Sequence, residues 1–175
     1  MFEDINSNLF LIINNLNINN PLNPVLIVLA KYLPILFIIY LIFNYIKGKK
    51  QIVFLAVISL ILGMLLNQII HIMYFYPRPN NISLGHTLFE HEGTSFPSDH
   101  TTFMLSISIL LLFFPETYYD GITLTIIGLF GGLLRVYCGI HFPFDILGSI
   151  IVSLISAILV FKCRRKLGIN QANTP

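Results

Sequence analysis

The sequence predicts an all-α integral membrane protein with about five transmembrane helices and an N-terminal interfacial amphipathic helix. Its 175 residues are 55% hydrophobic and only 10% charged, with a mean hydropathy of +0.80. A soluble domain carries about a quarter charged residues, so this chain has too little charge to cover a soluble surface. Five long apolar segments and two clusters of basic residues complete the pattern. The composition excludes a nucleic-acid-binding domain and a disulfide-stapled secreted miniprotein, and the length allows one domain.

The first element, residues 1–20, predicts an interfacial helix. Its apolar residues fall at helical spacing: Ile5, Leu9, Ile12, Ile13 and Leu16. Many asparagines lie between them, which makes the segment too polar to span a bilayer. We therefore expect it to lie at the membrane surface.

The transmembrane core is expected over residues 23–161. A spanning helix needs about 20 mostly apolar residues, and segments at about 23–46, 52–75, 98–114, 121–138 and 144–161 qualify. Pro34 is expected to kink the first span. The two cysteines, Cys138 and Cys163, fall near opposite membrane faces, so we expect no disulfide.

Basic residues predict the orientation of the spans. One cluster follows the first span and another follows the last: Lys47, Lys49, Lys50, then Lys162, Arg164, Arg165, Lys166. Five spans place both clusters on one side, which the positive-inside rule makes cytoplasmic. Residues 162–175 are then a cytoplasmic tail, and the N-terminus, the 76–97 loop and the turn at 140–143 face outside.

Three basic residues lie near or inside the spans instead, namely Lys31, Arg78 and Arg135. A charge at a helix centre costs about 2.5–3.5 kcal/mol on insertion scales, so such residues are functional candidates. For Lys31 we expect a position in which its ammonium contacts lipid headgroups. The same role is the alternative for Arg78 and Arg135.

Polar residues from three helix ends meet at the predicted outer face. His141 and Asp145 are four residues apart, so the carboxylate can hold one ring nitrogen and leave the other free to attack. Arg78 and Arg135 supply forked donors that suit phosphate oxygens. The alternative for His141 and Asp145 is a purely structural contact at a helix start.

The start of the third span adds an anion site. Ser98 is expected as its N-cap, and the free backbone N–H groups of Asp99 and His100 would point at an oxyanion. His100 is placed to donate a proton. Together these residues predict a phosphate site with a histidine nucleophile and a second histidine as acid.

These motifs resemble the three-part signature of the type 2 phosphatidic acid phosphatase superfamily. Arg78-Pro79, then Pro97-Ser98-Asp99-His100, then Arg135, His141 and Asp145 follow one another in the order of that signature. The run from Phe96 to Thr102, with Asp99 where many relatives have Gly, is similar to the bacterial undecaprenyl-diphosphatase branch associated with bacitracin resistance.

The resemblance implies a metal-independent lipid phosphatase without a cofactor. His141 would form a phosphohistidine, Asp145 would orient it, and His100 would protonate the leaving oxygen and then activate water. Arg78, Ser98, Arg135 and the backbone of Asp99 would bind the phosphoryl oxygens. Two positions depart from the signature: His71 stands where a Lys is common, and Leu134 where a Ser is common. His71 is therefore only a possible phosphate ligand.

The expected reaction is hydrolysis of undecaprenyl diphosphate at the outer face of a bacterial cytoplasmic membrane, which recycles the carrier lipid of cell-wall synthesis. The partners expected are this polyprenyl diphosphate and membrane lipid, with no nucleic acid; protein partners cannot be predicted. One alternative is another lipid phosphate, such as phosphatidylglycerophosphate or phosphatidic acid. A second is a non-catalytic lipid carrier or flippase. A third, a metal site in the loop, is disfavoured because its residues match no standard zinc spacing: His86, Glu90, His91, Glu92 and His100.

Overall fold

The computed structural model describes residues 2–165, and within that range the chain forms helices and no strands. The α-helices of the described chain are α1 (Phe2–Asn14), α2 (Asn23–Ile46), α3 (Lys50–Met73), α4 (Asp99–Leu111), α5 (Tyr118–Tyr137) and α6 (Pro143–Cys163). Short 3-10 helices lie in the connections: η1 (Asn15–Asn17), η2 (Pro79–Ile82) and η3 (Pro115–Thr117). The all-α prediction is confirmed. From residue 166 onward, the predicted tail lies outside the described residues.

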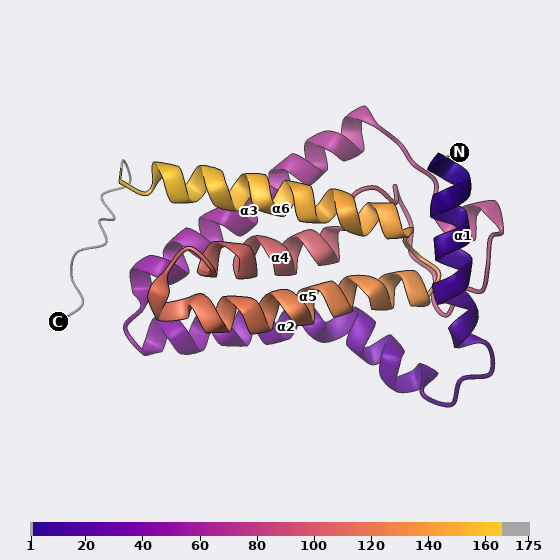
Figure 1. Ribbon diagram of the computed structural model, residues 1–175, viewed down its shortest axis with the longest axis horizontal. Helices are drawn as coiled ribbons and strands as arrows, with labels where there is room; N and C mark the ends of the chain where they lie inside the picture. The colour runs from indigo at the N-terminus through magenta and orange to yellow at the C-terminus, as the bar shows by residue number, and fades with distance from the viewer. Residues whose placement is uncertain (1, 166–175) are drawn as a thin grey trace.

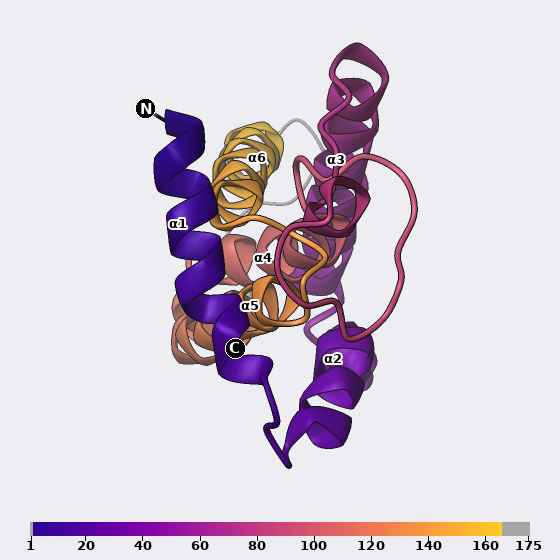
Figure 2. The ribbon, with the colours of Figure 1, turned by 90° about the vertical axis from the view of Figure 1, so that its right-hand side faces the viewer.

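The helices α2, α3, α5 and α6 surround α4, and α1 lies across one end of this bundle (Figure 1). Figure 2 looks onto that end, where α1 covers the ends of α5 and α6 while α2 and α3 end apart from each other. We call this the site end, where α1, the 76–97 loop and the α5–α6 turn meet. The start of α4 lies deeper in the bundle than the neighbouring ends of α5 and α6 (Figure 1).

Within residues 2–165, four helical segments are long and apolar enough to cross a membrane: Asn23–Ile46, Lys50–Met73, Pro115–Tyr137 and Pro143–Cys163. The predicted span at residues 98–114 differs from these. Its helix, α4, has only 13 residues, about 20 Å at 1.5 Å per residue, whereas the bilayer core is about 30 Å thick. Most of α4 is buried among the other helices. The five predicted positions all hold helices, but α4 is a central core helix rather than a full span.

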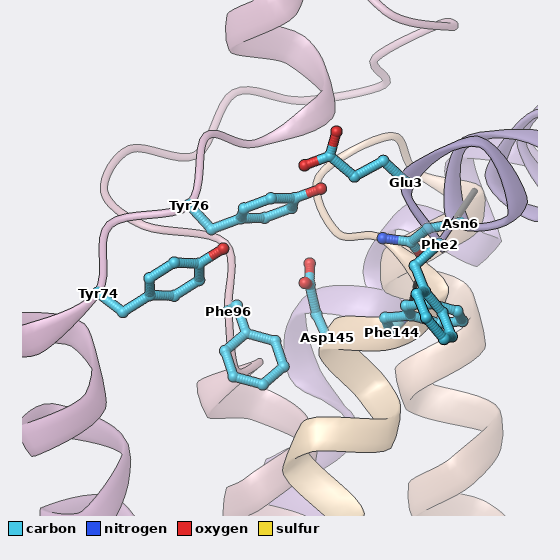
Figure 3. A pocket seen from close by; sticks show the side chains of 8 residues that line it. All are labelled: Phe2, Glu3, Asn6, Tyr74, Tyr76, Phe96, Phe144 and Asp145. Atoms are coloured by element: carbon cyan, nitrogen blue, oxygen red, sulfur yellow. Dashed lines mark hydrogen bonds between the residues drawn. The ribbon is translucent and has the colours of Figure 1, made fainter.

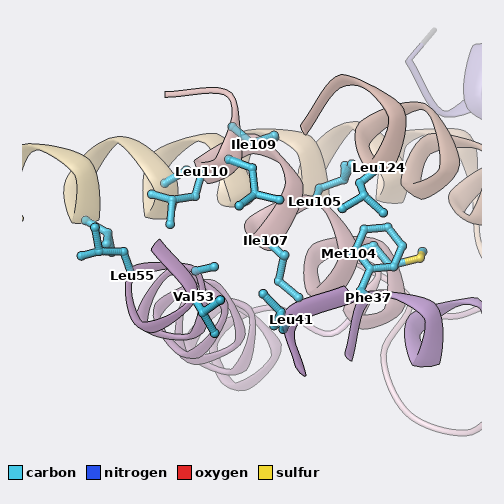
Figure 4. Packing of buried hydrophobic residues seen from close by; sticks show 14 of the residues in the cluster. Phe37, Leu41, Val53, Leu55, Met104, Leu105, Ile107, Ile109, Leu110 and Leu124 are labelled. Carbon is cyan, nitrogen blue, oxygen red and sulfur yellow. The ribbon is translucent and has the colours of Figure 1, made fainter. Parts of the chain in front are cut away.

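The main core lies where α4 packs between α2, α3 and α5 (Figure 4). Leu105, Ile107 and Leu110 of α4 are fully buried, and Phe37 of α2 and Leu55 of α3 pack in the same cluster. Burying such side chains contributes roughly 1.5–3 kcal/mol each in water. Against lipid the gain comes from close packing instead, because lipid tails are as apolar as leucine. The core thereby fixes α4, whose first turn reaches the site.

Small and hydroxyl residues bring α6 and α3 close to α4. Ser149 Oγ of α6 donates to the Ser98 carbonyl at 3.0 Å, and Ser59 Oγ of α3 donates to the Ser106 carbonyl at 2.8 Å. On α5, a Cβ on Gly132 would lie 2.9 Å from Ile146 Cγ2. Such contacts are typical of helix interfaces in membranes, where small residues permit close approach and hydroxyls bond across helices. They set the spacing of α4, α5 and α6 at the site.

The asparagines of the N-terminal segment face the protein. Asn14 and Asn17 are buried, and each donates through Nδ2 to the carbonyl oxygens of His86 and Tyr137 at 2.9–3.0 Å. Asn14 Oδ1 also accepts from His86 N at 2.7 Å. The predicted apolar residues Ile5, Leu9, Ile12 and Leu16 are exposed on α1 and η1. The segment thus holds the loop and α5 by its polar face and leaves an apolar face uncovered, as the predicted interfacial position requires.

Candidate active site

The turn between α5 and α6 carries His141. Gly139 makes this turn with φ +81°, a left-handed conformation that glycine adopts without strain. A Cβ at Gly139 would lie 2.5 Å from the His86 carbonyl oxygen, so the loop and the turn approach as closely as a glycine allows. Leu88 N donates to the Cys138 carbonyl at 3.0 Å across the same contact. His141, 1% exposed, is therefore held between two connections.

The hydrogen bonds of His141 fix its tautomer. Arg78 Nη1 lies 3.0 Å from His141 Nε2, and a guanidinium can only donate, so Nε2 is the acceptor and carries the lone pair. The proton then sits on Nδ1, which donates to Asp145 Oδ2 at 3.2 Å. The imidazole is thus arranged as a nucleophile at Nε2, with Asp145 behind it.

Asp145 is held in turn by three donors on one oxygen. Besides His141 Nδ1, its Oδ2 accepts from Phe142 N at 2.7 Å and from Ser95 Oγ in a short hydrogen bond. Ser95 Oγ also lies 3.5 Å from His141 Nδ1. Ser95 was not among the predicted site residues. Its signal in the sequence is faint, since it is one small polar residue two positions before Pro97.

Arg135 carries buried hydrogen-bond donors that no other residue within 2–165 satisfies. Its guanidinium is 1% exposed, and Nη1 donates to the Ala30 carbonyl at 3.3 Å. Its Nε and Nη2 are buried and have no hydrogen-bond partner among the described residues. Unpaired buried donors on a charged group are costly, so these two atoms call for an acceptor such as a phosphoryl oxygen.

Arg78 has partners on the loop and on the turn. Its Nε donates to the carbonyls of Glu92 and Gly93 at 3.2 Å, and Nη1 donates to Ile140 O at 2.8 Å as well as to His141. Arg78 therefore both positions the 76–97 loop and reaches the proposed nucleophile. The alternative in which Arg78 contacts lipid headgroups does not fit a side chain that is 4% exposed.

The first turn of α4 forms the floor of the site. Ser98 stands at the N-cap as predicted, but its hydroxyl makes no capping bond. Instead Thr101 Oγ1 donates to Ser98 Oγ at 3.1 Å, which leaves the Ser98 hydroxyl hydrogen for a ligand oxygen. Asp99 Oδ1 accepts from Asn67 Nδ2 at 2.9 Å, so its side chain faces α3 while its backbone stays in the first turn. Asn67 is a second buried residue that the sequence analysis missed.

The remaining histidines have different surroundings. His71 Nε2 donates to the Pro97 carbonyl at 3.1 Å, so it supports the entry into α4. His91 packs against His100 with ring centroids 6.3 Å apart and is half-buried rather than free in the loop. Burial lowers the pKa of His91 to about 4, and the nearby Arg78 and Arg135 act in the same direction. Within residues 2–165 no three His, Cys, Asp or Glu side chains gather as a metal site would require.

A hollow of about 250 Å³ lies on the Asp145 side of the histidine–aspartate pair (Figure 3). Its lining residues are mostly aromatic: Phe2, Glu3, Asn6, Tyr74, Tyr76, Phe96, Phe144 and Asp145. Asn6 Oδ1 accepts from Phe144 N at 3.0 Å, so α1 caps the start of α6 beside the site. The guanidinium of Arg78, by contrast, lies at His141 Nε2, away from the Asp145 carboxylate that lines the hollow.

Electrostatics keep His141 neutral. Burial lowers its pKa from the usual 6.5, Asp145 opposes that shift through its hydrogen bond and charge, and Arg78 and Arg135 lower the pKa further. A neutral imidazole, whose Nε2 lone pair here accepts from Arg78 Nη1, is the protonation state that nucleophilic attack requires.

Known proteins are similar to this chain in sequence and in fold. The sequence model that defines the PAP2 superfamily matches residues 52–169 of this chain. Undecaprenyl-diphosphatase BcrC of Bacillus subtilis (strain 168) is 36% identical over 82% of this chain and 76% of its own. The bacitracin transport permease protein BcrC of Bacillus licheniformis is 29% identical over 95% of this chain and 84% of its own. The crystal structure of Aquifex aeolicus LpxE superimposes with a TM-score of 0.78 at 27% identity, covering 90% of this chain and 95% of that one.

The matches and the helical bundle define a multi-pass membrane hydrolase of the lipid phosphatase class. The chain belongs to the PAP2 superfamily. The suspected resemblance to that superfamily and to its undecaprenyl-diphosphatase branch is thereby confirmed, and the link to bacitracin comes from the names of the BcrC relatives.

Proposed function

We propose that the protein hydrolyses undecaprenyl diphosphate to undecaprenyl phosphate and inorganic phosphate through a phosphohistidine at His141, without a metal ion. The name of the Bacillus subtilis relative, undecaprenyl-diphosphatase, supports the substrate. The observation that carries the mechanism is that Nε and Nη2 of Arg135 are buried donors without a partner among the described residues, while His141 Nε2 carries a lone pair. The charge of Arg135 acts on His141. A phosphoryl group satisfies both requirements at once.

In the first step His141 Nε2 attacks the terminal phosphorus. The bond from that phosphorus to the bridging oxygen breaks, and its electron pair stays on the lipid phosphate, whose bridging oxygen accepts a hydrogen bond from His100. Burial lowers the pKa of His100 to about 4, so this histidine is neutral in the first step. Asp145 stabilises the charge that the imidazole gains. Arg78, Arg135, Ser98 and the Asp99 backbone neutralise the equatorial oxygens, which is the main demand of phosphoryl transfer.

In the second step water attacks the phosphohistidine. Neutral His100 takes a proton from that water and later returns it to solvent, and the phosphorus–nitrogen bond breaks to release phosphate and regenerate His141. His71 contributes indirectly in this scheme, through its bond to the Pro97 carbonyl before α4.

We place the site at the outer face of a bacterial cytoplasmic membrane. The basic cluster of Lys47, Lys49 and Lys50 lies in the α2–α3 connection and at the first residue of α3, at the end of the bundle opposite the site end (Figure 1). The positive-inside rule assigns that opposite end to the cytoplasm. An outward site suits a carrier lipid that is left outside after its glycan has been transferred.

The test is phosphate release from undecaprenyl diphosphate by the purified full-length protein in detergent, with a chelator present. Wild type is expected to turn over, and His141→Ala is expected to lose at least about three orders of magnitude in kcat, as loss of a covalent nucleophile implies. His86→Ala, which removes an exposed imidazole from the same end, is the matched control and should stay near wild type. Full activity of His141→Ala, or loss of activity with the chelator, would overturn the proposal.

Another lipid phosphate is the first alternative, because the site donors contact only a phosphoryl group. Competition between undecaprenyl diphosphate, phosphatidylglycerophosphate and phosphatidic acid separates these substrates by kcat/KM. A higher kcat/KM for either phospholipid would keep the chemistry and replace the substrate.

A lipid carrier or flippase is the alternative of another class, and the name of the Bacillus licheniformis relative describes transport. This alternative predicts movement of labelled lipid across liposome membranes without phosphate release. The arrangement of His141 with Asp145 disfavours it, because headgroup binding alone requires no oriented lone pair.

A further inference from the structure

The ammonium of Lys31 occupies an unusual position for a charge on a spanning helix. It lies 4.4 Å from the centroid of the Phe89 ring. Within residues 2–165 no carboxylate lies at ion-pair distance from this ammonium; the ion pair of that part of the chain joins His141 and Asp145. A lysine in this position is costly unless it meets an anion or an aromatic face.

Phe89 links Lys31 to the phosphate site. The Arg135 guanidinium carbon lies 5.6 Å from the centroid of the same ring. The distance between Lys31 Nζ and Arg135 Cζ therefore cannot exceed the sum of their two distances to the Phe89 centroid. Phe89 itself is packed against a buried cluster that includes Leu134, Tyr137 and Ile140, so the ring is a fixed platform.

A hydrogen bond from Arg135 to the backbone of α2 keeps the two cations close to each other. Arg135 Nη1 donates to the carbonyl of Ala30, the residue immediately before Lys31. Ala30 is 3% exposed and belongs to the same buried cluster as Leu134. This contact commits one Arg135 nitrogen to α2 and leaves Nε and Nη2 for the ligand, beside the helix that carries Lys31.

We propose that Lys31 binds the second phosphate of a lipid diphosphate, the phosphate that remains on the lipid. The proposal deepens the proposed function and rests on it. The terminal phosphate would occupy the donors of Arg135 and Arg78, and the lipid-linked phosphate would lie toward α2 and meet the Lys31 ammonium. A flexible ammonium suits this role because it acts as a point charge and does not demand one fixed geometry.

The charge balance of the reaction explains the benefit. When the bond from phosphorus to the bridging oxygen breaks, the electron pair stays on the lipid phosphate, and Lys31 stabilises this developing charge. When the substrate is a lipid monophosphate, the leaving group is the lipid alcohol, and no second phosphate lies near Lys31. The residue therefore selects diphosphates over monophosphates, largely in the transition state.

The chain offers a matched control for this test. Lys47 stands at the opposite end of α2, and its ammonium also lies 4.4 Å from a phenyl centroid, that of Phe43. Lys31→Gln and Lys47→Gln each remove one charge and one cation–aromatic contact from the same helix. Only the first is near the site.

The experiment measures kcat/KM for undecaprenyl diphosphate and for phosphatidic acid with the full-length protein in detergent, which removes headgroup contacts in a bilayer. Lys31→Gln should lose on the order of 10- to 100-fold with the diphosphate, the range of one charge-assisted hydrogen bond. It should change less than about 3-fold with the monophosphate. Lys47→Gln should match wild type with both, and Lys31→Arg should recover part of the loss.

Two results would overturn the assignment of Lys31. One is an unchanged kcat/KM of Lys31→Gln for the diphosphate, and the other is an equal loss with both substrates, which would indicate a structural role. Failure of the proposed function gives a different result, because wild type would then cleave no diphosphate.

Discussion

At the scale of single residues, the protonation state of His141 decides whether the site can react. Its pKa lies below 6.5 because of burial, with Arg78 and Arg135 adding to the shift against Asp145. Protonation of Nε2 removes the attacking lone pair, so activity is lost as the pH falls through this pKa. We predict that kcat/KM for the diphosphate stays high down to pH 6.5 and declines only below it. An acid limb with its midpoint above 6.5 would show that the charge of Asp145 outweighs burial.

Ser95 is a positioning residue whose loss should alter that profile. Its hydroxyl donates to Asp145 Oδ2, the same oxygen that accepts from His141 Nδ1. In Ser95→Ala the carboxylate loses a donor, pulls more strongly on the imidazolium, and raises the pKa of His141. We predict a kcat about 10-fold lower, with an acid limb moved to higher pH and KM little changed.

Ser95→Thr keeps the hydroxyl and should restore most of the rate. A Ser95→Ala protein with an unchanged pH profile would reduce Ser95 to a packing role. Thr94→Ala is a neighbouring control, because the Thr94 hydroxyl bonds to the Tyr76 backbone rather than to Asp145.

At the scale of elements, the α5–α6 turn depends on the close approach at Gly139. Both Gly139 and Gly48 have positive φ, +81° and +90°, but a Cβ on Gly48 would meet nothing within 4 Å. Gly48→Ala should therefore cost only the conformational strain, about 1–2 kcal/mol. Gly139→Ala adds a clash with the His86 carbonyl and displaces His141.

We predict that Gly139→Ala lowers the thermal midpoint in detergent by more than Gly48→Ala and reduces kcat, whereas Gly48→Ala keeps its kcat. Equal shifts and equal rates for the two variants would contradict the close approach as a determinant of the site.

The N-terminal segment makes a second prediction at this scale. Asn14 is fully buried and bonds to backbone groups of His86 and Tyr137, whereas its neighbour Asn15 is exposed. Asn14→Ala leaves His86 N unpaired and removes one of the two asparagine donors to the His86 and Tyr137 carbonyls. An unpaired buried donor costs about 1–3 kcal/mol, and each kcal/mol lowers the thermal midpoint by roughly 2–4 °C in a chain of this size. Thermal unfolding should show this loss for Asn14→Ala and less than about 1 °C for Asn15→Ala.

The elements also explain which features the sequence could predict. The helices could be predicted because long apolar runs are local signals. The set of site residues could be predicted because their order along the chain is visible in the sequence: Arg78, His100, Arg135, His141 and Asp145. The burial of α4 was not, because an apolar run looks alike whether it faces lipid or other helices. Only its 13-residue length distinguishes it from a span.

The polar anchors were missed for a related reason. Asn6, Asn14 and Asn17 lie in an asparagine-rich segment whose apolar spacing predicts an amphipathic surface helix. Their partners are backbone groups more than 60 residues away in sequence, such as His86 O. The spacing of apolar residues along the sequence does not predict a hydrogen bond to a distant backbone group. Ser95 and Asn67 were inaccessible in the same way, because each acts on a site residue through the fold alone.

At the scale of the whole molecule, orientation is the main prediction. Cys163 is exposed at the end of α6, while Cys138 is buried, so the native chain carries one exposed thiol. A membrane-impermeant thiol reagent should leave Cys163 unlabelled in intact cells stripped of their wall and should label it after permeabilisation. An Asn15→Cys variant, exposed on the site end, should show the reverse pattern. Labelling of native Cys163 from outside would invert the proposed topology.

The measurement that tests the central claim most directly is the trapping of a phosphate on His141. With a diphosphate, the leaving lipid phosphate needs little help from an acid, so His100→Ala should slow the water step more than the first step. After mixing His100→Ala with diphosphate labelled in its terminal phosphate, we predict label on the protein that survives alkali, is lost in acid and maps to His141. A protein that cleaves the substrate yet never carries the label, or carries it in the His141→Ala, His100→Ala double variant, would contradict the account.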